Sequence, residues 1–446
     1  MDGIGGTSGM TDTATVGTMD TLETTYLRAK WVIDGRGGEP IANGAVVMRG
    51  GRIVEVGPAA QVHVPEGGAV LRLDYPDGTI LPGLVDTHLH LNGMGDGRGG
   101  DDLATLPEEL LLLQTAKNAR RHLLSGVTTL RDCGAMKRTT FMLREAVRQG
   151  IASSPRLVLC GRPITITGGH LWFLGEEADG VDGVRRAVRR LVKEGADFIK
   201  VVATGGSTRS SYPTRAAYLP EEMRALVEEA RRFGKPVAAH CSGTEGTLRA
   251  LDAGMGEGDT IIHCVFREPD GSTLFRPEVA RRLADQGVWV DATLAQSGAR
   301  ERLLRQRAGR DGGLSEREQR ELAGLGEARC VRQDHFQRLL DAGVKMVSGS
   351  DSAWGWYGTG EFQYEVIDHS QWGMGSMAAI LSATRDAAAC LGLAREVGTL
   401  EIGKRADVLV VDGDPVADIH ALLNVRDVFL AQVQVQHERY GETRPF

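Results

Sequence analysis

The sequence predicts an α/β protein, a (β/α)8 TIM barrel with a small discontinuous β-sandwich domain built from N- and C-terminal segments. Three observations support this prediction. Between residues 81 and 394, apolar runs alternate with amphipathic stretches of helical period, the pattern of repeated βα units. Short apolar runs separated by turn residues flank this region on both sides. The 446 residues suit one barrel of about 250 residues and a smaller unit.

The N-terminal segment begins with a stretch that cannot form a core. Residues 1–24 are rich in Gly, Thr, Asp and Met with few large apolar side chains, which predicts a disordered tail. Neither residues 25–80 nor residues 395–446 can bury both faces of a sheet alone, so we expect them to form one composite domain. The strands predicted in these two segments are 30–33, 44–48, 52–56, 69–73, 398–406, 407–411 and 425–435.

The barrel region, residues 81–394, contains eight apolar runs of strand length. They are 84–91, 127–131, 156–159, 198–203, 236–240, 260–263, 288–292 and 345–348. Several of the helices between them end at a glycine, which favours the left-handed conformation of a helix C-terminus. These helices are 106–124, 183–194, 220–233, 245–253, 277–285 and 330–342. The charged stretch 299–327 predicts a solvated helical excursion, and residues 377–391 predict one long helix.

Composition and charge narrow the class of partner. A net charge of -7 and a pI near 5.9 provide no basic surface for nucleic acid or an anionic membrane, which favours a small-molecule substrate. The sequence has neither a long apolar run nor an N-terminal secretory pattern, so we expect a cytoplasmic protein. The six cysteines are scattered and predict reduced thiols, with Cys241 and Cys264 in packing roles. The sequence is compatible with a homo-oligomer but does not determine the oligomeric state.

Polar side chains occur at the ends of five predicted barrel strands. His88 and His90, two residues apart on a strand, point to the same face. Carboxyl ends of barrel strands converge on one cavity, so we expect a two-metal site. Its members are His88, His90, Lys200, His240, His263 and Asp351. Taken alone, each histidine is more commonly a hydrogen-bonded core or surface residue, and Lys200 a buried lysine that has an acidic partner.

Lys200 needs a separate explanation because an ammonium group cannot bind a metal ion. A buried neutral amine can react with carbon dioxide to give a carbamate, whose two oxygens can bridge two ions. Zinc is the first choice for these ions, and cobalt, manganese or nickel would suit the same ligands.

Six stretches of the sequence together resemble one known family. They are LPGLVDTHLH (81–90), GVTTLRD (126–132), TGGH (167–170), IKVVATGG (199–206), SGSD (348–351) and GKRADV (403–408). The chain resembles the amidohydrolase superfamily of metal-dependent hydrolases, in particular its imidazolonepropionase-like branch with the Xaa-Pro-type carboxypeptidases ("prolidases"). The resemblance implies one metal on His88, His90, Asp351 and carboxylated Lys200, and a second on the same carbamate, His240 and His263.

The expected reaction is hydrolysis of an amide-type bond in an N-acyl amino acid, a dipeptide or a related amide. A hydroxide that bridges two metals is a strong nucleophile at neutral pH. Asp351 is the expected general base and then the proton donor to the leaving amine. His170, on a glycine-rich loop, is either a substrate or oxyanion contact or a solvated loop histidine.

The mouth loops supply candidates for substrate binding. An Arg-Tyr pair could hold a carboxylate, and aromatic residues could form an apolar pocket, although solvated loops and lid packing are alternatives. The candidates are Trp172, Arg209, Tyr212, Arg215, Tyr218, Trp354 and Trp356. Two other functions stay open: a hydrolase of carbamate, thiocarbamate or phenylurea compounds, and an inactive barrel used as an assembly module.

Overall fold

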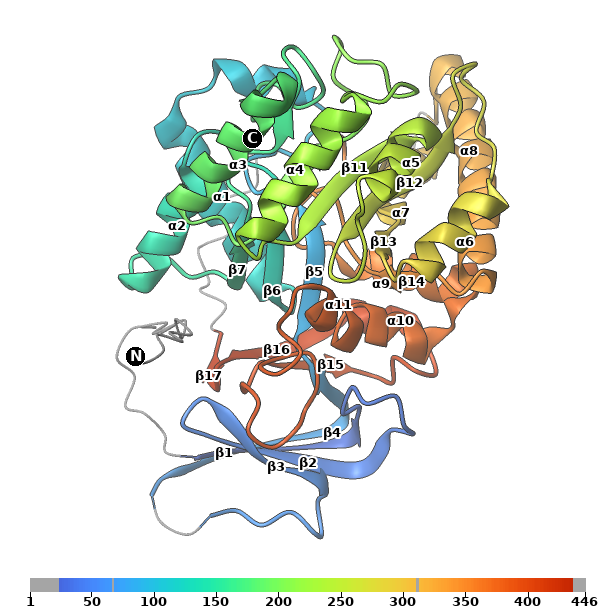
Figure 1. Ribbon diagram of the computed structural model, residues 1–446. Coiled ribbons are helices and arrows are strands. Elements are labelled where there is room, and N and C mark those ends of the chain that lie inside the picture. Colours follow the sequence, from blue (N-terminus) through green and yellow to red (C-terminus); the bar gives the residue numbers. More distant parts are fainter. Residues whose placement is uncertain (1–23, 66–67, 310–312, 436–446) are drawn as a thin grey trace, which may run out of the picture.

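The computed structural model describes residues 24–65, 68–309 and 313–435, and Figure 1 shows a barrel above a smaller β-rich part. The tail predicted for residues 1–24 lies outside the described residues, except for Thr24, which begins the first strand. None of the helices within the described ranges combines the length and apolar character needed to cross a membrane.

The described residues include a strand at each of the eight predicted barrel positions. These strands are β5 (Leu84–Leu89), β6 (Val127–Asp132), β7 (Arg156–Leu159), β10 (Ile199–Val202), β11 (Val237–Gly243), β12 (Thr260–Arg267), β13 (Trp289–Asp291) and β14 (Lys345–Val347). They pair in parallel as β5-β6-β7 and as β10 to β14 in chain order. The TIM-barrel-like fold is therefore confirmed.

Backbone hydrogen bonds join these two groups of strands. The amide of Asp197, just before β10, donates to the carbonyl of Leu159 at 2.7 Å. On the other side, the amide of Thr87 donates to the carbonyl of Ser348 at 3.1 Å, and the amide of Asp351 donates to the carbonyl of His88 at 2.7 Å. The second junction holds the ends of β5 and β14 together.

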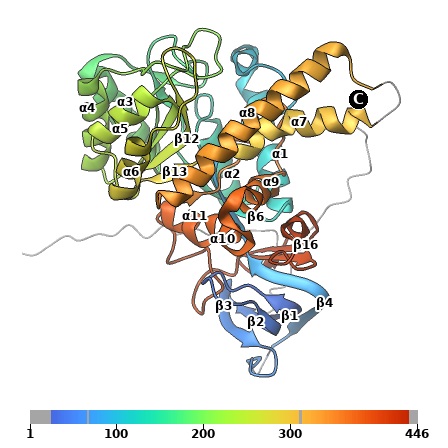
Figure 2. The same ribbon diagram turned by 90° about the vertical axis from the view of Figure 1, so that its right-hand side faces the viewer.

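Helices surround the barrel strands. They are α1 (Glu108–Leu124), α2 (Thr139–Arg148), α3 (Gly180–Glu194), α4 (Pro220–Arg232), α5 (Thr244–Asp252) and α6 (Pro277–Asp285), with a short 3-10 helix η1 (Gly100–Thr105). Sequence analysis missed α2 and two short strands, β8 (Ile164–Thr165), which pairs with β10, and β9 (Glu176–Glu177), which pairs with β8. The long α7 (Leu294–Ala308) and α8 (Glu316–Asp341) form a hairpin that projects beyond the barrel (Figure 2). They correspond to the predicted excursion, and α8 also includes most of the helix predicted at 330–342.

The last part of the barrel region differs from the prediction of one helix at 377–391. The chain forms α9 (Gln363–His369), η2 (Ser370–Met374), α10 (Ser376–Ser382) and α11 (Arg385–Cys390). The break lies at Ala383 and Thr384. The carbonyl of Ala383 accepts a hydrogen bond from the amide of Val85 in β5, and Thr384 has φ -134° and ψ -89°, which are not helical. Attachment to the barrel strand therefore replaces the continuous helix.

Strands from both chain ends form one sheet beside the barrel. Within the described residues its order is β17-β16-β15-β4-β1-β2-β3, and β15 pairs antiparallel with β4 to join the two segments. The strands are β1 (Thr24–Val32), β2 (Ile41–Arg49), β3 (Arg52–Pro58), β4 (Val70–Pro82), β15 (Val408–Asp412), β16 (Val425–Leu430) and β17 (Val433–Gln434). Because they form one hydrogen-bonded sheet, a sandwich of two sheets is not confirmed.

Two details of this sheet differ from the prediction. The strand predicted at 425–435 is divided into β16 and β17 by a turn at Ala431 and Gln432, whose φ values are 48° and 74°. The segment 398–406 is not a regular strand. A 3-10 helix, η3 (Ile419–Leu423), lies between β15 and β16.

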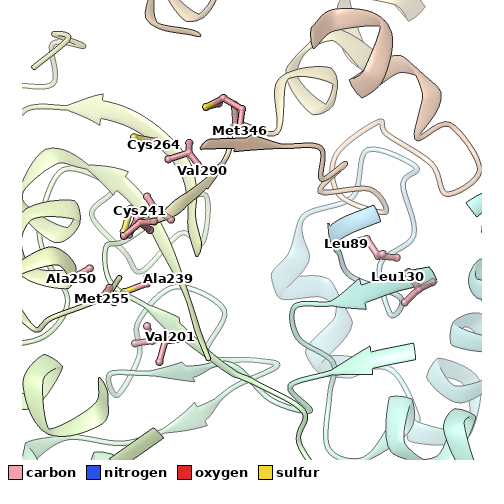
Figure 3. Packing of buried hydrophobic residues seen from close by; sticks show 14 of the residues in the cluster. Leu89, Leu130, Val201, Ala239, Cys241, Ala250, Met255, Cys264, Val290 and Met346 are labelled. Carbon is pink, nitrogen blue, oxygen red and sulfur yellow. The ribbon is translucent and has the colours of Figure 1, made fainter. Parts of the chain in front are cut away.

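The wall of the barrel is apolar on the side that faces the surrounding helices. Figure 3 shows Cys241 and Cys264 among residues such as Ala239, Val290 and Met346. Both thiols are buried, and burial raises the pKa of each. Their predicted role in packing is confirmed.

Candidate metal centre

Three predicted ligands converge at the junction of β5 and β14. Nε2 of His88 lies 3.6 Å, and Nε2 of His90 3.8 Å, from Oδ1 of Asp351. One donor atom from each residue lies within 4.8 Å of the other two, so the group could hold a metal ion. Asp351 has a φ of 50°, in the left-handed region, and the hydrogen bond from its amide to the carbonyl of His88 fixes this turn.

Lys200 lies beside these ligands and is fully buried. Its Nζ is 3.5 Å from Nε2 of His88. Among the residues that the structure describes, no carboxylate lies within 4.0 Å of this amine. The alternative of a buried lysine with an acidic partner is therefore not supported. An ammonium group buried here without a paired charge would be costly.

His240 and His263 form a second group of nitrogen donors in the same site. Nδ1 of His240 and Nε2 of His263 are 2.9 Å apart, and the two ring centroids are 4.5 Å apart. Thr293 fixes the His263 ring, because its Oγ1 lies 2.7 Å from Nδ1. The His263 ring is also 5.4 Å from the His88 ring, which connects the two groups.

Burial sets the charge state of these side chains. It lowers the pKa of His90 to about 3, and it lowers the pKa values of His88, His240 and His263 well below the usual value. The neutral imidazoles that result are the form that binds metals. Burial also raises the pKa of Asp351 to about 7. Imidazole nitrogens with a carboxylate oxygen suit a divalent transition-metal ion, so the residues fit such a group.

Asp86 and His122 hold in place the backbone that carries the candidate ligands. Sequence analysis did not single out these two residues. Nε2 of His122 lies 2.8 Å from Oδ2 of Asp86, and both side chains are fully buried. Asp86 also accepts hydrogen bonds from the amides of His88 and Ser350, at 3.1 and 3.0 Å, and from the Ser350 hydroxyl at 2.6 Å. The Asp86 carboxylate therefore joins the end of β5 to the loop that carries Asp351. Its position in the LPGLVDTHLH stretch is the signal that could have identified it.

Four of the candidate ligands line a cavity of about 710 Å³ at the carboxyl ends of the strands, namely His90, His240, His263 and Asp351. His170 lines this cavity with its ring centroid 4.5 Å from that of His240. Its Nδ1 lies 2.7 Å from Oγ1 of Thr208, and burial lowers its pKa to about 3. His170 is thus a fixed, buried side chain and not a solvated loop histidine.

The predicted substrate contacts divide into two groups. Arg209 and Trp354 line the cavity, whereas the other five do not. Tyr218 is buried in the hydrophobic core, where its hydroxyl donates to the carbonyl of Ala178. The remaining four are Trp172, Tyr212, Arg215 and Trp356, and Arg215 stacks on Tyr212 at 5.1 Å.

The cavity also contains side chains that sequence analysis missed. These are Arg267, Gln296 and Arg332. Phe173, which follows Trp172 on the aromatic mouth loop where sequence analysis expected an apolar pocket, also lines the cavity. Arg332 lies in a helix rich in charged residues, and no pattern in that helix separates it from the solvated arginines around it.

Removal of bound metal is expected to lower both activity and thermal stability, because the buried donors would lose the cation that joins them. A ligand present at about 100 times its dissociation constant stabilises the folded state by about 2.7 kcal/mol. Unfolding temperatures and metal content should be compared before and after chelation and after zinc is restored. The control is His63→Ala, at a histidine side chain that is 87% exposed, which should keep the full rise in unfolding temperature that zinc produces. His90→Ala should reduce this rise. An unchanged unfolding temperature and less than one ion per purified chain would contradict the prediction.

The barrel and its buried histidines define a class of protein: an enzyme whose active site lies at the carboxyl ends of the barrel strands. The profile of the amidohydrolase family matches residues 79–435. The chain belongs to this family, which confirms the resemblance in the six sequence stretches and indicates a hydrolase of carbon–nitrogen bonds.

Individual relatives extend over nearly the whole chain. Ochratoxinase from Aspergillus niger is 28% identical over 436 residues, which cover 91% of this chain and 84% of that protein. The crystal structure of a Xaa-Pro dipeptidase with bound methionine has a TM-score of 0.76 and 27% identity, and it covers 93% of this chain and 100% of that one. A prolidase complexed with N-methylphosphonate-L-proline has a TM-score of 0.77 and 26% identity, with the same coverage.

Proposed function

We propose that this protein is a binuclear metal-dependent amidohydrolase that cleaves the amide bond of an N-acyl amino acid, a dipeptide or a related amide. The observation that carries the proposal is the convergence of His88, His90 and Asp351 beside a buried Lys200 that has no acidic partner in the described part of the chain. The named activities of the relatives, a dipeptidase and a prolidase among them, support this bond type.

The donor groups of this site would hold two divalent cations. His88, His90 and Asp351 would bind one, and His240 and His263 would bind the other. Lys200 would contribute to both as an N6-carboxylysine, because its buried amine lies beside His88 and a carbamate formed on it would have two oxygens, one for each cation. When bound, such cations supply a hydroxide nucleophile at neutral pH and polarise a carbonyl, and zinc is the first candidate.

The protein's own side chains would move protons and position the substrate. The carboxylate of Asp351, 13% exposed, reaches the cavity and would accept the proton of the attacking water and deliver it to the leaving amine. His170 would orient the substrate carbonyl, since Thr208 fixes its ring. Gly206 leaves space for that ring, because a Cβ at this position would lie only 2.4 Å from Nε2 of His170.

An apolar wall near His90 would receive the uncharged part of the substrate. The rings of Phe173 and Trp354 meet edge to face with centroids 6.1 Å apart, and Trp354 lies 5.1 Å from the His90 ring. An aromatic or aliphatic acyl group would fit this wall. Aryl carbamates and phenylureas would fit it too, so this observation keeps the second candidate function open.

Steady-state kinetics with the zinc-loaded enzyme would test the proposal. N-acyl amino acids and dipeptides are expected to reach kcat/KM values on the order of 10⁴ M⁻¹s⁻¹ or more, above those for aryl carbamates, thiocarbamates and phenylureas. A preference for the carbamates or ureas would favour the second function. Protein that carries both ions and hydrolyses none of these compounds would overturn the proposal in favour of an assembly module.

A further inference from the structure

A buried carboxylate on α9 caps the first turn of α7. Glu365 is fully buried, and its two oxygens accept hydrogen bonds from the amides of Leu294 and Ala295, at 2.9 and 2.7 Å. The first amides of a helix have no acceptor within the helix itself. The first turn of α7 has no acidic residue, and the side chain of Thr293, its N-cap residue, makes no capping hydrogen bond. Glu365 therefore supplies the negative charge that the positive end of the α7 dipole favours.

The residues that Glu365 holds belong to the wall of the catalytic cavity. Thr293, directly before Leu294, lines the cavity, and so do Gln296 and Ser297 in the first turn of α7. Thr293 has a φ of 48° and a ψ of 54°, a left-handed conformation that β-branched residues rarely adopt. Such a conformation persists only where the surrounding structure fixes it. The two hydrogen bonds to Glu365, directly after Thr293, fix this turn.

The hydroxyl of Thr293 determines which nitrogen of His263 carries the proton. Its Oγ1 donates its single proton to the carbonyl of Ala292, at 2.8 Å, and lies 2.7 Å from Nδ1 of His263. Because that proton is already in use, Oγ1 accepts a hydrogen bond from the His263 ring. The neutral ring is therefore protonated at Nδ1 and presents the lone pair of Nε2, the atom that lies 2.9 Å from Nδ1 of His240.

The other group of candidate ligands is held by different contacts. His88, His90 and Asp351 lie at the junction of β5 and β14, where Asp86 accepts hydrogen bonds from backbone amides on both sides. The turn before α7 thus supports one group of ligands, and the Asp86 junction supports the other.

Glu365 also contacts His369, one turn further along α9. Its Oε1 lies 3.2 Å from Nε2 of His369, whose Nδ1 lies 3.3 Å from Oγ of Ser348 and 3.2 Å from Oγ of Ser382. This branch of the buried network leads to the end of β14 and to α10, whereas the branch through the α7 amides leads to His263. Substitutions at Glu365 and His369 can therefore separate the two branches.

We propose that Glu365 is a positioning residue for the cation at His240 and His263. It acts through the turn at Thr293, which sets the orientation and the protonated nitrogen of His263, and it leaves the ligands of the other cation in place. This inference rests on the proposed binuclear function and adds to it a residue that determines the occupancy of one metal position.

Zinc titration of metal-depleted protein in bicarbonate buffer tests this role. Wild type is expected to bind two ions per chain. Glu365→Gln should bind one ion as wild type does and the other about 10- to 100-fold more weakly, the usual loss when a group behind a metal ligand is changed. Glutamine keeps one acceptor oxygen but turns an NH2 group toward the second amide of α7. Excess zinc should restore kcat, which a misfolded site would not allow.

Two further variants identify the ion that is lost. His369→Gln is the matched control, because it changes a buried side chain of the same helix and network, and it should bind both ions as wild type does. His263→Ala already lacks the ligand that Glu365 is proposed to hold. Adding Glu365→Gln to His263→Ala should therefore change zinc binding no further, since the two substitutions act on one site.

Three results with Glu365→Gln at a wild-type unfolding temperature overturn the inference. The variant binds both ions as wild type does, it loses affinity for both equally, or His369→Gln weakens the same ion to the same extent. If Glu365→Gln does not fold, Thr293→Val and Thr293→Ser decide. Valine lacks the hydroxyl and should weaken one ion, serine should keep it, and equal zinc binding by the two rejects the proposal. A wild-type chain that binds fewer than two ions contradicts the binuclear function itself, which is a separate result.

Discussion

Lys200→Ala is expected to lower kcat by at least about 10³-fold, because metal-ion stabilisation of a transition state is worth several kcal/mol. Lys200 is fully buried, and its Nζ lies 3.5 Å from Nε2 of His88. As a carboxylated side chain, it would be the one group shared by both cations. Alanine would leave each cation short of an anionic ligand and would open a space where the proposed carbamate would lie.

The space left in Lys200→Ala provides the sharpest form of this experiment. Acetate, formate or propionate should enter it and restore part of the activity in a saturable manner, because each supplies a carboxylate with two oxygens. Lys200→Arg should show no such rescue, since it fills the space with a cation. The control is Lys193→Ala, at an exposed position of α3, which should retain wild-type kcat. Full turnover by Lys200→Ala without added acid would contradict the role of the carbamate.

The barrel was predictable from sequence because each of its strands has a strong local signal. The strands are short, apolar on both faces and bounded by turn residues, so β10 and β14 were found within one residue or two of their observed bounds. The break at Ala383 was not predictable, because it depends on a hydrogen bond from Val85, about 300 residues away. The short strands β8 and β9 likewise exist through pairing and have no periodic pattern of their own.

The candidate metal ligands were predictable for a geometric reason. The parallel barrel brings the carboxyl ends of its strands together, so residues at those ends meet wherever they lie in the sequence. The loop contacts lack such a rule. Tyr218 follows the strand-4 loop and packs into the core, whereas Arg332 reaches the cavity from the side of a long charged helix. Side-chain direction in loops and insertions depends on tertiary packing, which the sequence pattern does not encode.

Asp351→Asn is expected to lower kcat by about 10²- to 10⁴-fold, the range lost when a general acid–base group is removed. The substitution separates proton transfer from folding more cleanly than alanine would. Asp351 has a φ of 50°, and asparagine tolerates this left-handed conformation well. The amide oxygen can still face His88 and His90, but the neutral amide cannot take the proton of the attacking water. The backbone is therefore preserved while the chemistry is removed.

Three measurements on Asp351→Asn distinguish a lost base from a lost metal. Metal content per chain and unfolding temperature should stay close to wild type, while kcat falls and KM changes little, because an interaction made only in the transition state is lost. Asp334→Asn, at a 60% exposed side chain of α8, is the control and should behave as wild type. A kcat within tenfold of wild type at equal metal content would contradict the proton-transfer role of Asp351. The first side chain to test in its place is then His170, which lines the cavity beside His240.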